Sequence, residues 1–207
     1  MFETVQKFNA VSTDIINQCI ADYTSRQSYQ TDTMNKTEPG KSMGILREIC
    51  EEAVGQKLKS AGGNFYRHHL PYLPHTDYRT NSDNIVNAVI PLRYDGDAVP
   101  QLLIFDQMWL KDSVTWCMHH PLIHFEVNTG VLGYPCDYPV EGLTDQDIND
   151  ELYDNYLSHL PKNGLRGLSG KNYPFTPGSI IIFDNRKIHC TSTLFAEKLG
   201  ISLRFAL

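Results

Sequence analysis

The chain has 207 residues, and its length, composition and charge already exclude several classes of protein. Hydrophobic residues make up 41% and charged residues 20%, which excludes a disordered or fibrous chain. The 18 basic and 24 acidic residues give a net charge of −6 and form no basic stripe, so we expect neither nucleic acid nor an anionic membrane as a partner. No apolar run reaches the roughly 18 residues of a membrane span. At roughly 150 residues per domain, the length of the chain predicts a single domain over residues 1–207.

The cysteines indicate a reducing compartment. Their number is odd, they are spread over the chain, and no two form a CxxC pair: Cys19, Cys50, Cys117, Cys136 and Cys190. This pattern is typical of free thiols in a cytoplasmic protein and argues against a disulfide framework or a zinc finger.

The first 62 residues predict two helices. Ser12 and its neighbours can cap a helix whose apolar positions between Ile15 and Tyr23 recur at helical spacing. A second helix is expected from about Met43 to Ser60, where Gly62-Gly63 would end it. We expect this region to support the rest of the domain.

After residue 63 the chain reads as short strands with one late helix. Apolar or alternating runs, each bounded by turn residues, predict strands over Asn64–Leu70, Asn84–Leu92, Gln101–Phe105, Val114–Met118, Ile123–Val127, Ser179–Phe183 and Leu199–Leu207. The helix is expected over Asp145–Leu160, with Thr144 as its cap. The predicted fold is mainly β with flanking helices, as a β-sandwich or jelly roll.

Three features carry candidate chemistry. His75 and Asp77 precede a strong strand, and because residues i and i+2 of extended backbone point to one side, both could bind the same ion. Such a pair also occurs by chance. His189 follows the apolar strand Ser179–Phe183, at the rim of the predicted sheet, where an imidazole could complete a site.

The last strand is the third feature. Its residues Ile201, Leu203, Phe205 and Leu207 share one face, which we expect in the core. The other face is formed by Ser202, Arg204 and Ala206. A single arginine among small residues suits an anion pocket, since its guanidinium can bind a carboxylate through two hydrogen bonds. The alternative is an ordinary surface arginine.

The three features occur in a fixed order: an HxD motif, a lone histidine after an apolar strand, and an arginine on the last strand. In this order the chain resembles the Fe(II)/2-oxoglutarate-dependent dioxygenase superfamily. The resemblance covers about Asn64–Leu207. It implies a double-stranded β-helix (jelly-roll) core over 63–207 and one Fe(II) held by His75, Asp77 and His189. It also implies 2-oxoglutarate and O₂ as cosubstrates, with Arg204 holding the distal carboxylate of 2-oxoglutarate.

Two further positions are assigned through the resemblance. Many members have a serine two residues after the arginine, where this chain has Ala206; Ser202, on the face of Arg204, could replace that contact. Members often place a tyrosine before the HxD motif to bind the keto acid, and we choose Tyr66 over Tyr72 because Tyr66 lies in a predicted strand.

Other polar residues have weaker claims. Asn87 interrupts an apolar strand and is expected to be buried, either as a satisfied core residue or in the cosubstrate pocket. Cys190 beside His189 is expected to pack rather than bind metal. Two histidine clusters without acidic or cysteine partners at familiar spacing give little support to a second metal site: His68 and His69, and His119, His120 and His124.

These observations predict an oxygenase that hydroxylates a C–H bond of a small metabolite or amino-acid-like substrate. The alternatives are a peptidyl side-chain hydroxylase of the same superfamily, a non-catalytic metal-binding jelly roll, and a zinc hydrolase that uses the histidine cluster. We expect an insert at about 128–172, rich in glycine, to cover the iron site and contact substrate. The alternative is that this insert packs on the outer surface of the sheet.

Overall fold

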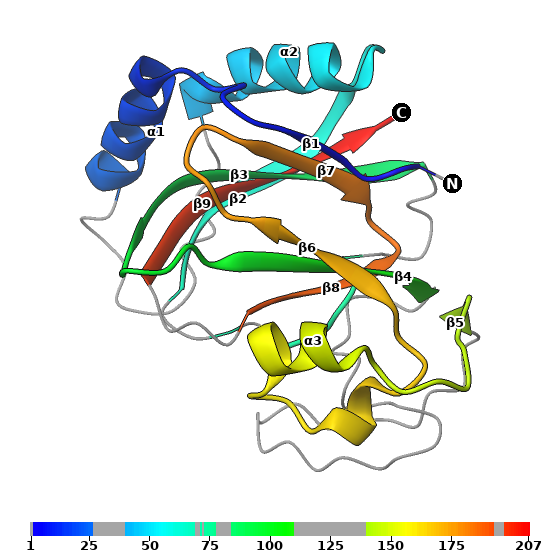
Figure 1. Cartoon of the computed structure of the whole chain (residues 1–207). Helices are drawn as coiled ribbons and strands as arrows, with labels where there is room; N and C mark the ends of the chain where they lie inside the picture. Colours follow the sequence, from blue (N-terminus) through cyan, green and yellow to red (C-terminus); the bar gives the residue numbers. More distant parts are fainter. Residues whose placement is uncertain are drawn as a thin grey trace.

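The protein is built from two antiparallel β-sheets that face each other, with helices on their outer sides (Figure 1). The computed structural model describes residues 2–26, 40–68, 71, 73–77, 84–109, 140–192 and 197–207. The larger sheet has the order β1-β7-β3-β9-β2, and the smaller has the order β5-β4-β6, with β8 also paired to β4. The mainly β fold with flanking helices is therefore confirmed. Among the described residues, no helix is long and apolar enough to span a membrane.

The elements of the larger sheet are β1 (Val5–Lys7), β2 (Lys59–His68), β3 (Ile85–Asp95), β7 (Ile180–Asp184) and β9 (Glu197–Ala206). Those of the smaller sheet are β4 (Gln101–Trp109), β5 (Val140–Glu141), β6 (Gly170–Pro174) and β8 (Lys187–Thr191). The helical segments are α1 (Thr13–Arg26), η2 (Gly40–Ser42), α2 (Met43–Val54), α3 (Asp150–Leu152), η4 (Tyr153–Leu157) and η5 (Lys162–Leu165). The strands expected over Val114–Met118 and Ile123–Val127 lie outside the described residues.

Helix α1 begins where the sequence predicts, but α2 ends early. The Ser12 hydroxyl accepts a hydrogen bond from the Ile15 amide at 3.4 Å. The expectation that the second helix reaches Ser60 is wrong, because Gly55 closes it in a left-handed conformation with φ +74°. Gly63 instead lies in β2, where a Cβ atom would come within 2.5 Å of Leu203 Cδ2. This glycine permits a close approach between strands.

The outer face of the larger sheet is packed beneath α1 and α2. On β9, Ile201, Leu203 and Phe205 point to this helix-covered core and are fully buried, as expected. Leu207 is 46% exposed, so its expected core position is wrong; β9 ends one residue before it. The buried members of this core are Val11, Cys19, Tyr23, Leu46, Cys50, Leu58, Phe65, Val86, Ala88, Ile90, Leu92, Ile180, Ile182, Leu199, Ile201, Leu203 and Phe205.

A second core lies between the two sheets. Val89, Ile181 and Phe183 from the larger sheet pack against Leu102 and Ile104 of β4. Because side chains alternate along a strand, these residues define the inner face of each sheet. Residues of opposite parity on the same strands face outward.

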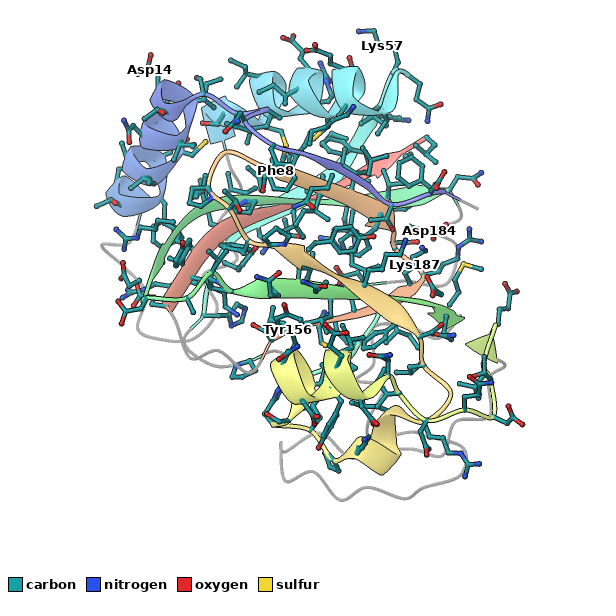
Figure 2. All side chains as sticks on the ribbon, in the orientation of Figure 1. Phe8, Asp14, Lys57, Tyr156, Asp184 and Lys187 are labelled. Carbon is teal, nitrogen blue, oxygen red and sulfur yellow. The ribbon has the colours of Figure 1, made fainter. Side chains whose placement is uncertain are left out.

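The outer face of the smaller sheet is covered by the segment from Leu143 to Leu168. Leu157 and its neighbours pack there against Phe105 and Ile188, and Tyr156 lies between η4 and the sheet (Figure 2). The late helix is shorter than expected. Its cap is Asn149, whose side-chain oxygen accepts from the Leu152 amide at 3.0 Å; the assignment of Thr144 as the cap is wrong.

This packing tests the prediction that the insert at about 128–172 covers the iron site. The described part, from residue 140 onward, packs on the sheet surface that faces away from the inner core, as the alternative anticipated. It therefore supports the smaller sheet from outside. Residues 128–139 lie outside the described part of the chain.

Candidate metal centre

The metal centre is built where the HxD segment pairs with β8. The backbones of His75 and His189 exchange two hydrogen bonds, from the His75 amide to the His189 carbonyl at 3.0 Å and back at 2.9 Å. This antiparallel bridge fixes the two residues directly opposite each other. The two imidazole centroids are 4.2 Å apart. Two residues separated by more than a hundred positions in the sequence are thus held by the sheet itself.

His189 points inward and its neighbours on β8 point outward. Its ring packs edge-on against Phe183 with centroids 4.8 Å apart. Ile188 and Cys190 instead belong to the outer cluster beneath the 143–168 segment, so the expectation that Cys190 packs is confirmed. The alternation along the strand therefore places His189 between the sheets.

Asp77 completes the group. His75 Nε2 lies 3.8 Å from Asp77 Oδ1, and His189 Nε2 lies 3.7 Å from Asp77 Oδ2. One ligand atom from each of the three residues falls within 4.8 Å of the others. Two imidazole nitrogens and a carboxylate at this spacing can bind one ion together, and this donor set leaves further positions of the ion open.

Both imidazoles are held in the tautomer that a metal requires. His75 Nδ1 donates to the Leu73 carbonyl at 2.7 Å, and His189 Nδ1 donates to the Lys187 carbonyl at 3.0 Å. A carbonyl oxygen can only accept, so in each neutral ring the proton lies on Nδ1 and the lone pair on Nε2. The backbone thus orients both Nε2 atoms as metal ligands.

Electrostatics keep His75 and Asp77 in their metal-binding protonation states. Burial and the charge of His189 lower the pKa of His75 to about 4, so this ring is neutral at pH 7. Burial alone would raise the pKa of Asp77, but the charges of His189, His75 and Arg204 lower it below its usual value. The carboxyl group is therefore ionised at neutral pH.

Asn87 holds the carboxylate of Asp77. Its side-chain amide donates to Asp77 Oδ2 at 2.8 Å, and Asn87 is fully buried on the inner face of β3. Its own side-chain oxygen is buried and has no hydrogen-bond partner among the described residues. Asn87 thus contacts the metal centre rather than being only a satisfied core residue.

The remaining predicted site residues share the inner face of the larger sheet. Ser202 and Arg204 lie on the β9 face opposite the helix-covered core, as expected. In register, Arg204 pairs with Asn87 and Ser202 pairs with Val89. Tyr66 of β2 pairs with Gly200 and packs against Phe175, and burial raises the pKa of its hydroxyl.

The sequence analysis missed one buried residue of this face, Lys198. The predicted strand began at Leu199, whereas β9 begins at Glu197 and so includes Lys198. Extending the alternation of Ser202 and Arg204 by two residues toward the start of the strand would have found it. His69 and Tyr72, as well as the histidine cluster at 119–124, lie outside the described residues.

The comparisons with known proteins identify the fold. No family model matches the chain, and no curated protein matches it. Among solved structures, the fold is similar to that of the non-heme α-ketoglutarate-dependent epimerase SnoN from nogalamycin biosynthesis, with a TM-score of 0.56 and 10% identity over 98% of this chain and 78% of that one. SnoN is also described in complex with Fe³⁺, α-ketoglutarate and nogalamycin RO.

Two further structures have the same overall fold. A prolyl-4-hydroxylase from Pseudomonas putida matches with a TM-score of 0.50 and 14% identity, covering 98% of this chain and 85% of that chain. AviO1 from Streptomyces viridochromogenes matches with a TM-score of 0.52 and 10% identity, covering 99% and 89%. The chain therefore has the jelly-roll fold of the non-heme α-ketoglutarate-dependent enzymes, as its motif order predicted.

Proposed function

We propose that the protein is an Fe(II)- and 2-oxoglutarate-dependent oxygenase. The observation that carries this proposal is the convergence of His75 Nε2, His189 Nε2 and the Asp77 carboxylate within 4.8 Å, between the sheets of a jelly roll. The donor set fits the ion, since two neutral imidazoles and one carboxylate are the ligands of non-heme Fe(II) oxygenases. Bound iron would supply oxidation of a substrate C–H bond by O₂, coupled to oxidative decarboxylation of 2-oxoglutarate to succinate.

The chain's own residues would prepare this chemistry. The carbonyls of Leu73 and Lys187 hold the two histidines in one tautomer, and the Asn87 amide orients the Asp77 carboxylate. The hydrophobic core between the sheets excludes water from the side of the ligands that faces Phe183. These contacts would fix ligand geometry before a metal binds.

The cosubstrate would lie along the inner face of β9. Ser202 and Arg204 of that strand, together with Tyr66 of the neighbouring strand, line this face. In our proposal these three side chains serve the cosubstrate pocket, and hydroxylation of a small metabolite or amino-acid-like molecule is the reaction. The similarity to SnoN favours a small-molecule substrate, and the similarity to a prolyl-4-hydroxylase favours a peptide side chain as the second candidate.

The thiols support a reducing compartment. The described cysteines Cys19, Cys50 and Cys190 are buried, and none of them forms a disulfide with another described cysteine. Burial raises the pKa of Cys50 to about 12, which keeps its thiol protonated and unreactive. We therefore propose that the protein works in the cytoplasm.

Formation of succinate tests the proposal. Purified protein with Fe(II), O₂ and 2-oxoglutarate should release succinate even without substrate, and amino acids or small metabolites that are substrates should increase the rate. Zn(II) in place of Fe(II) should give none. A hydrolase or a non-catalytic metal-binding module would release no succinate under any of these conditions, and that result would contradict the proposal.

A further inference from the structure

The turn between β7 and β8 is closed by an ion pair between Asp184 and Arg186. The Arg186 guanidinium donates two hydrogen bonds to the Asp184 carboxylate, from Nε to Oδ1 at 2.8 Å and from a terminal nitrogen to Oδ2 at 2.7 Å. The backbone amide of Arg186 also donates to Asp184 Oδ1, at 3.1 Å. Two parallel bonds from a guanidinium to a carboxylate hold both groups in one geometry. The three bonds therefore fix the course of the chain across this turn.

The carboxylate of this ion pair is shielded from water. The Asp184 side chain is 4% exposed, and that of Arg186 is 25% exposed. Burial alone would raise the pKa of Asp184, but the hydrogen bonds from Arg186 and its charge lower this pKa below its usual value. Removing one partner of a buried pair leaves the other charge uncompensated, which is costly. The pair therefore holds the turn more firmly than an exposed pair would.

The turn carries the chain from the larger sheet to the smaller one in two residues. β7 ends at Asp184 and β8 begins at Lys187, and Figure 2 shows both residues at the same end of the sheets. The residues on either side of the turn contact the His189 imidazole. The Phe183 ring packs edge-on against it at 4.8 Å, and the Lys187 carbonyl accepts from its Nδ1 at 3.0 Å. The turn thus sets the relative position of two groups that orient one candidate metal ligand.

Asp184 itself points away from the metal centre. Phe183 belongs to the core between the sheets, whereas Ile182 belongs to the helix-covered core. Because side chains alternate along β7, Asp184 shares the side of Ile182 and not that of the metal ligands. Any influence of this carboxylate on His189 therefore passes through the backbone of the turn.

The N-terminal segment holds the same turn from outside. β1 runs beside β7 as its antiparallel neighbour (Figure 1). Just before β1, the Thr4 hydroxyl accepts from the Lys187 ammonium at 3.4 Å, and a backbone hydrogen bond from Phe2 reaches the Asp184 carboxylate. Both ends of the turn are thus anchored to the N-terminal segment, and the ion pair closes the turn from within.

We propose that the Asp184–Arg186 ion pair positions the metal ligand His189, by holding the backbone carbonyl that accepts from its Nδ1. This inference rests on the function proposed above, since that function requires the metal centre. A neutral imidazole can carry its proton on either ring nitrogen. While the carbonyl is held in place, the proton lies on Nδ1 and Nε2 is free to bind an ion. When the turn loosens, part of the protein carries the proton on Nε2, which then cannot bind the metal.

Calorimetric titration of the full chain with Mn(II) measures the effect. Asp184→Asn keeps the shape of the side chain but removes its charge, and it should weaken Mn(II) binding by about 10-fold, the lower end of the effect of residues that orient a metal ligand. Arg186→Gln removes the other partner and should weaken binding to a similar extent. Because the two side chains act as a unit, the double variant should bind no more weakly than either single variant.

Arg67→Gln is the matched control. Arg67 forms an ion pair of the same geometry with Glu197, at 2.8 and 2.7 Å, between two strands that carry no proposed metal ligand. This variant also loses a bidentate ion pair, so its change in stability in urea shows what a merely structural role produces. It should keep the parent affinity for Mn(II).

The position of the His189 ring proton is a readout that a loss of stability does not move. Long-range ¹H–¹⁵N spectra of the metal-free protein at about pH 8, where an ordinary imidazole is neutral, show which ring nitrogen carries the proton. The His189 signals are those missing from the spectrum of His189→Ala. The proton should lie on Nδ1 in the parent and in Arg67→Gln, and should be shared between both nitrogens in Asp184→Asn and Arg186→Gln.

The possible failures point to different errors. If the parent binds no Mn(II), the proposed function fails together with the inference. If the parent binds Mn(II) but both ion-pair variants keep its affinity and the Nδ1 proton, the function stands and the inference is overturned. Equal losses of affinity in Arg67→Gln and in these variants would also overturn it, since the loss of any ion pair would then suffice. If Asp184→Asn does not fold, Arg186→Gln decides, because it retains the buried carboxylate.

Discussion

The two ends of the inner face solve the problem of buried polar groups in different ways. At the metal centre the chain itself satisfies them: each imidazole donates to a backbone carbonyl, and the Asp77 carboxylate accepts from Asn87. At the other end Lys198 is equally buried, yet its ammonium has no partner among the described residues. The first arrangement fixes geometry in advance, whereas the second leaves a charge for a ligand to neutralise. Removing a hydrogen-bonded polar group at the metal centre should therefore lower the stability of the unliganded protein, whereas removing the charge of Lys198 should raise it.

The largest effect is expected at His189. His189→Ala removes one of three metal ligands and should lower the rate of Fe(II)-dependent succinate formation by at least about 100-fold. The loss of a residue that only orients a metal ligand can already reach that size. The rate is measured at saturating 2-oxoglutarate, with circular dichroism to confirm folding. Cys190→Ala is the matched control: it is the next residue on β8, but it points to the outer core and should keep the parent rate. Equal losses in the two variants would contradict the alternation on which the site is built.

A smaller effect is expected at Asn87. Asn87→Ala removes the hydrogen bond to Asp77 Oδ2 and should weaken Mn(II) binding by about 10- to 100-fold, the usual effect of removing a residue that orients a ligand. The affinity is measured by calorimetric titration. Val89→Ala, two residues along the same inner face, is the control and should retain the parent affinity, because Val89 packs between the sheets and does not contact the carboxylate. Unchanged affinity in Asn87→Ala would show that Asp77 needs no such support.

The outer cluster should contribute to stability and not to metal binding. Leu157 is fully buried against the smaller sheet, so Leu157→Ala should lower the free energy of unfolding by about 2–5 kcal/mol, through lost burial and a new cavity. Urea denaturation measures this change. The Mn(II) affinity of the folded variant should equal that of the parent. A loss of metal affinity without a loss of stability would assign the 143–168 segment to the site.

Lys198 should produce a rise in stability with pH. Its pKa is about 8 in the folded protein and near 10.5 when unfolded, so between these values the unfolded chain binds more protons and the free energy of unfolding increases with pH. The full rise is on the order of 3 kcal/mol. His159 and Cys190 are the titratable groups that interact with Lys198. Lys198→Met should be more stable than the parent at pH 7 and should lack this rise. A parent stability that is flat from pH 8 to 10.5 would contradict the burial of a charged lysine.

Much of the site could be predicted because strands impose a simple geometry. The i, i+2 spacing of His75 and Asp77 predicted ligands on one side of the chain, and the alternation of β9 predicted the inner position of Arg204. The pairing of His75 with His189 could not be read from local pattern, since it is a long-range contact, and it entered only through the family resemblance. Asn87 was recognised as a buried polar residue, but its partner depends on the register between strands.

The errors have equally local causes. Gly62-Gly63 resembles a helix end, yet the helix had already stopped at Gly55. Gly63 instead permits the close packing of β2 on β9, and Gly62 adopts a positive φ of +125° within β2. Lys198 was missed because the predicted strand began with the apolar run at Leu199, whereas β9 already begins at Glu197 and buries the Lys198 side chain. The burial of a charged residue is hard to predict from sequence when the group that neutralises its charge is a ligand, because no residue of the chain then marks the position as buried.

The account depends most directly on one metal site formed by three residues. Calorimetric titration of the parent chain with Mn(II) should give one ion per molecule, and the triple variant His75→Ala, Asp77→Ala, His189→Ala should give none while remaining folded by circular dichroism. Binding of one ion with the parent affinity by the triple variant would place the metal elsewhere and contradict the account.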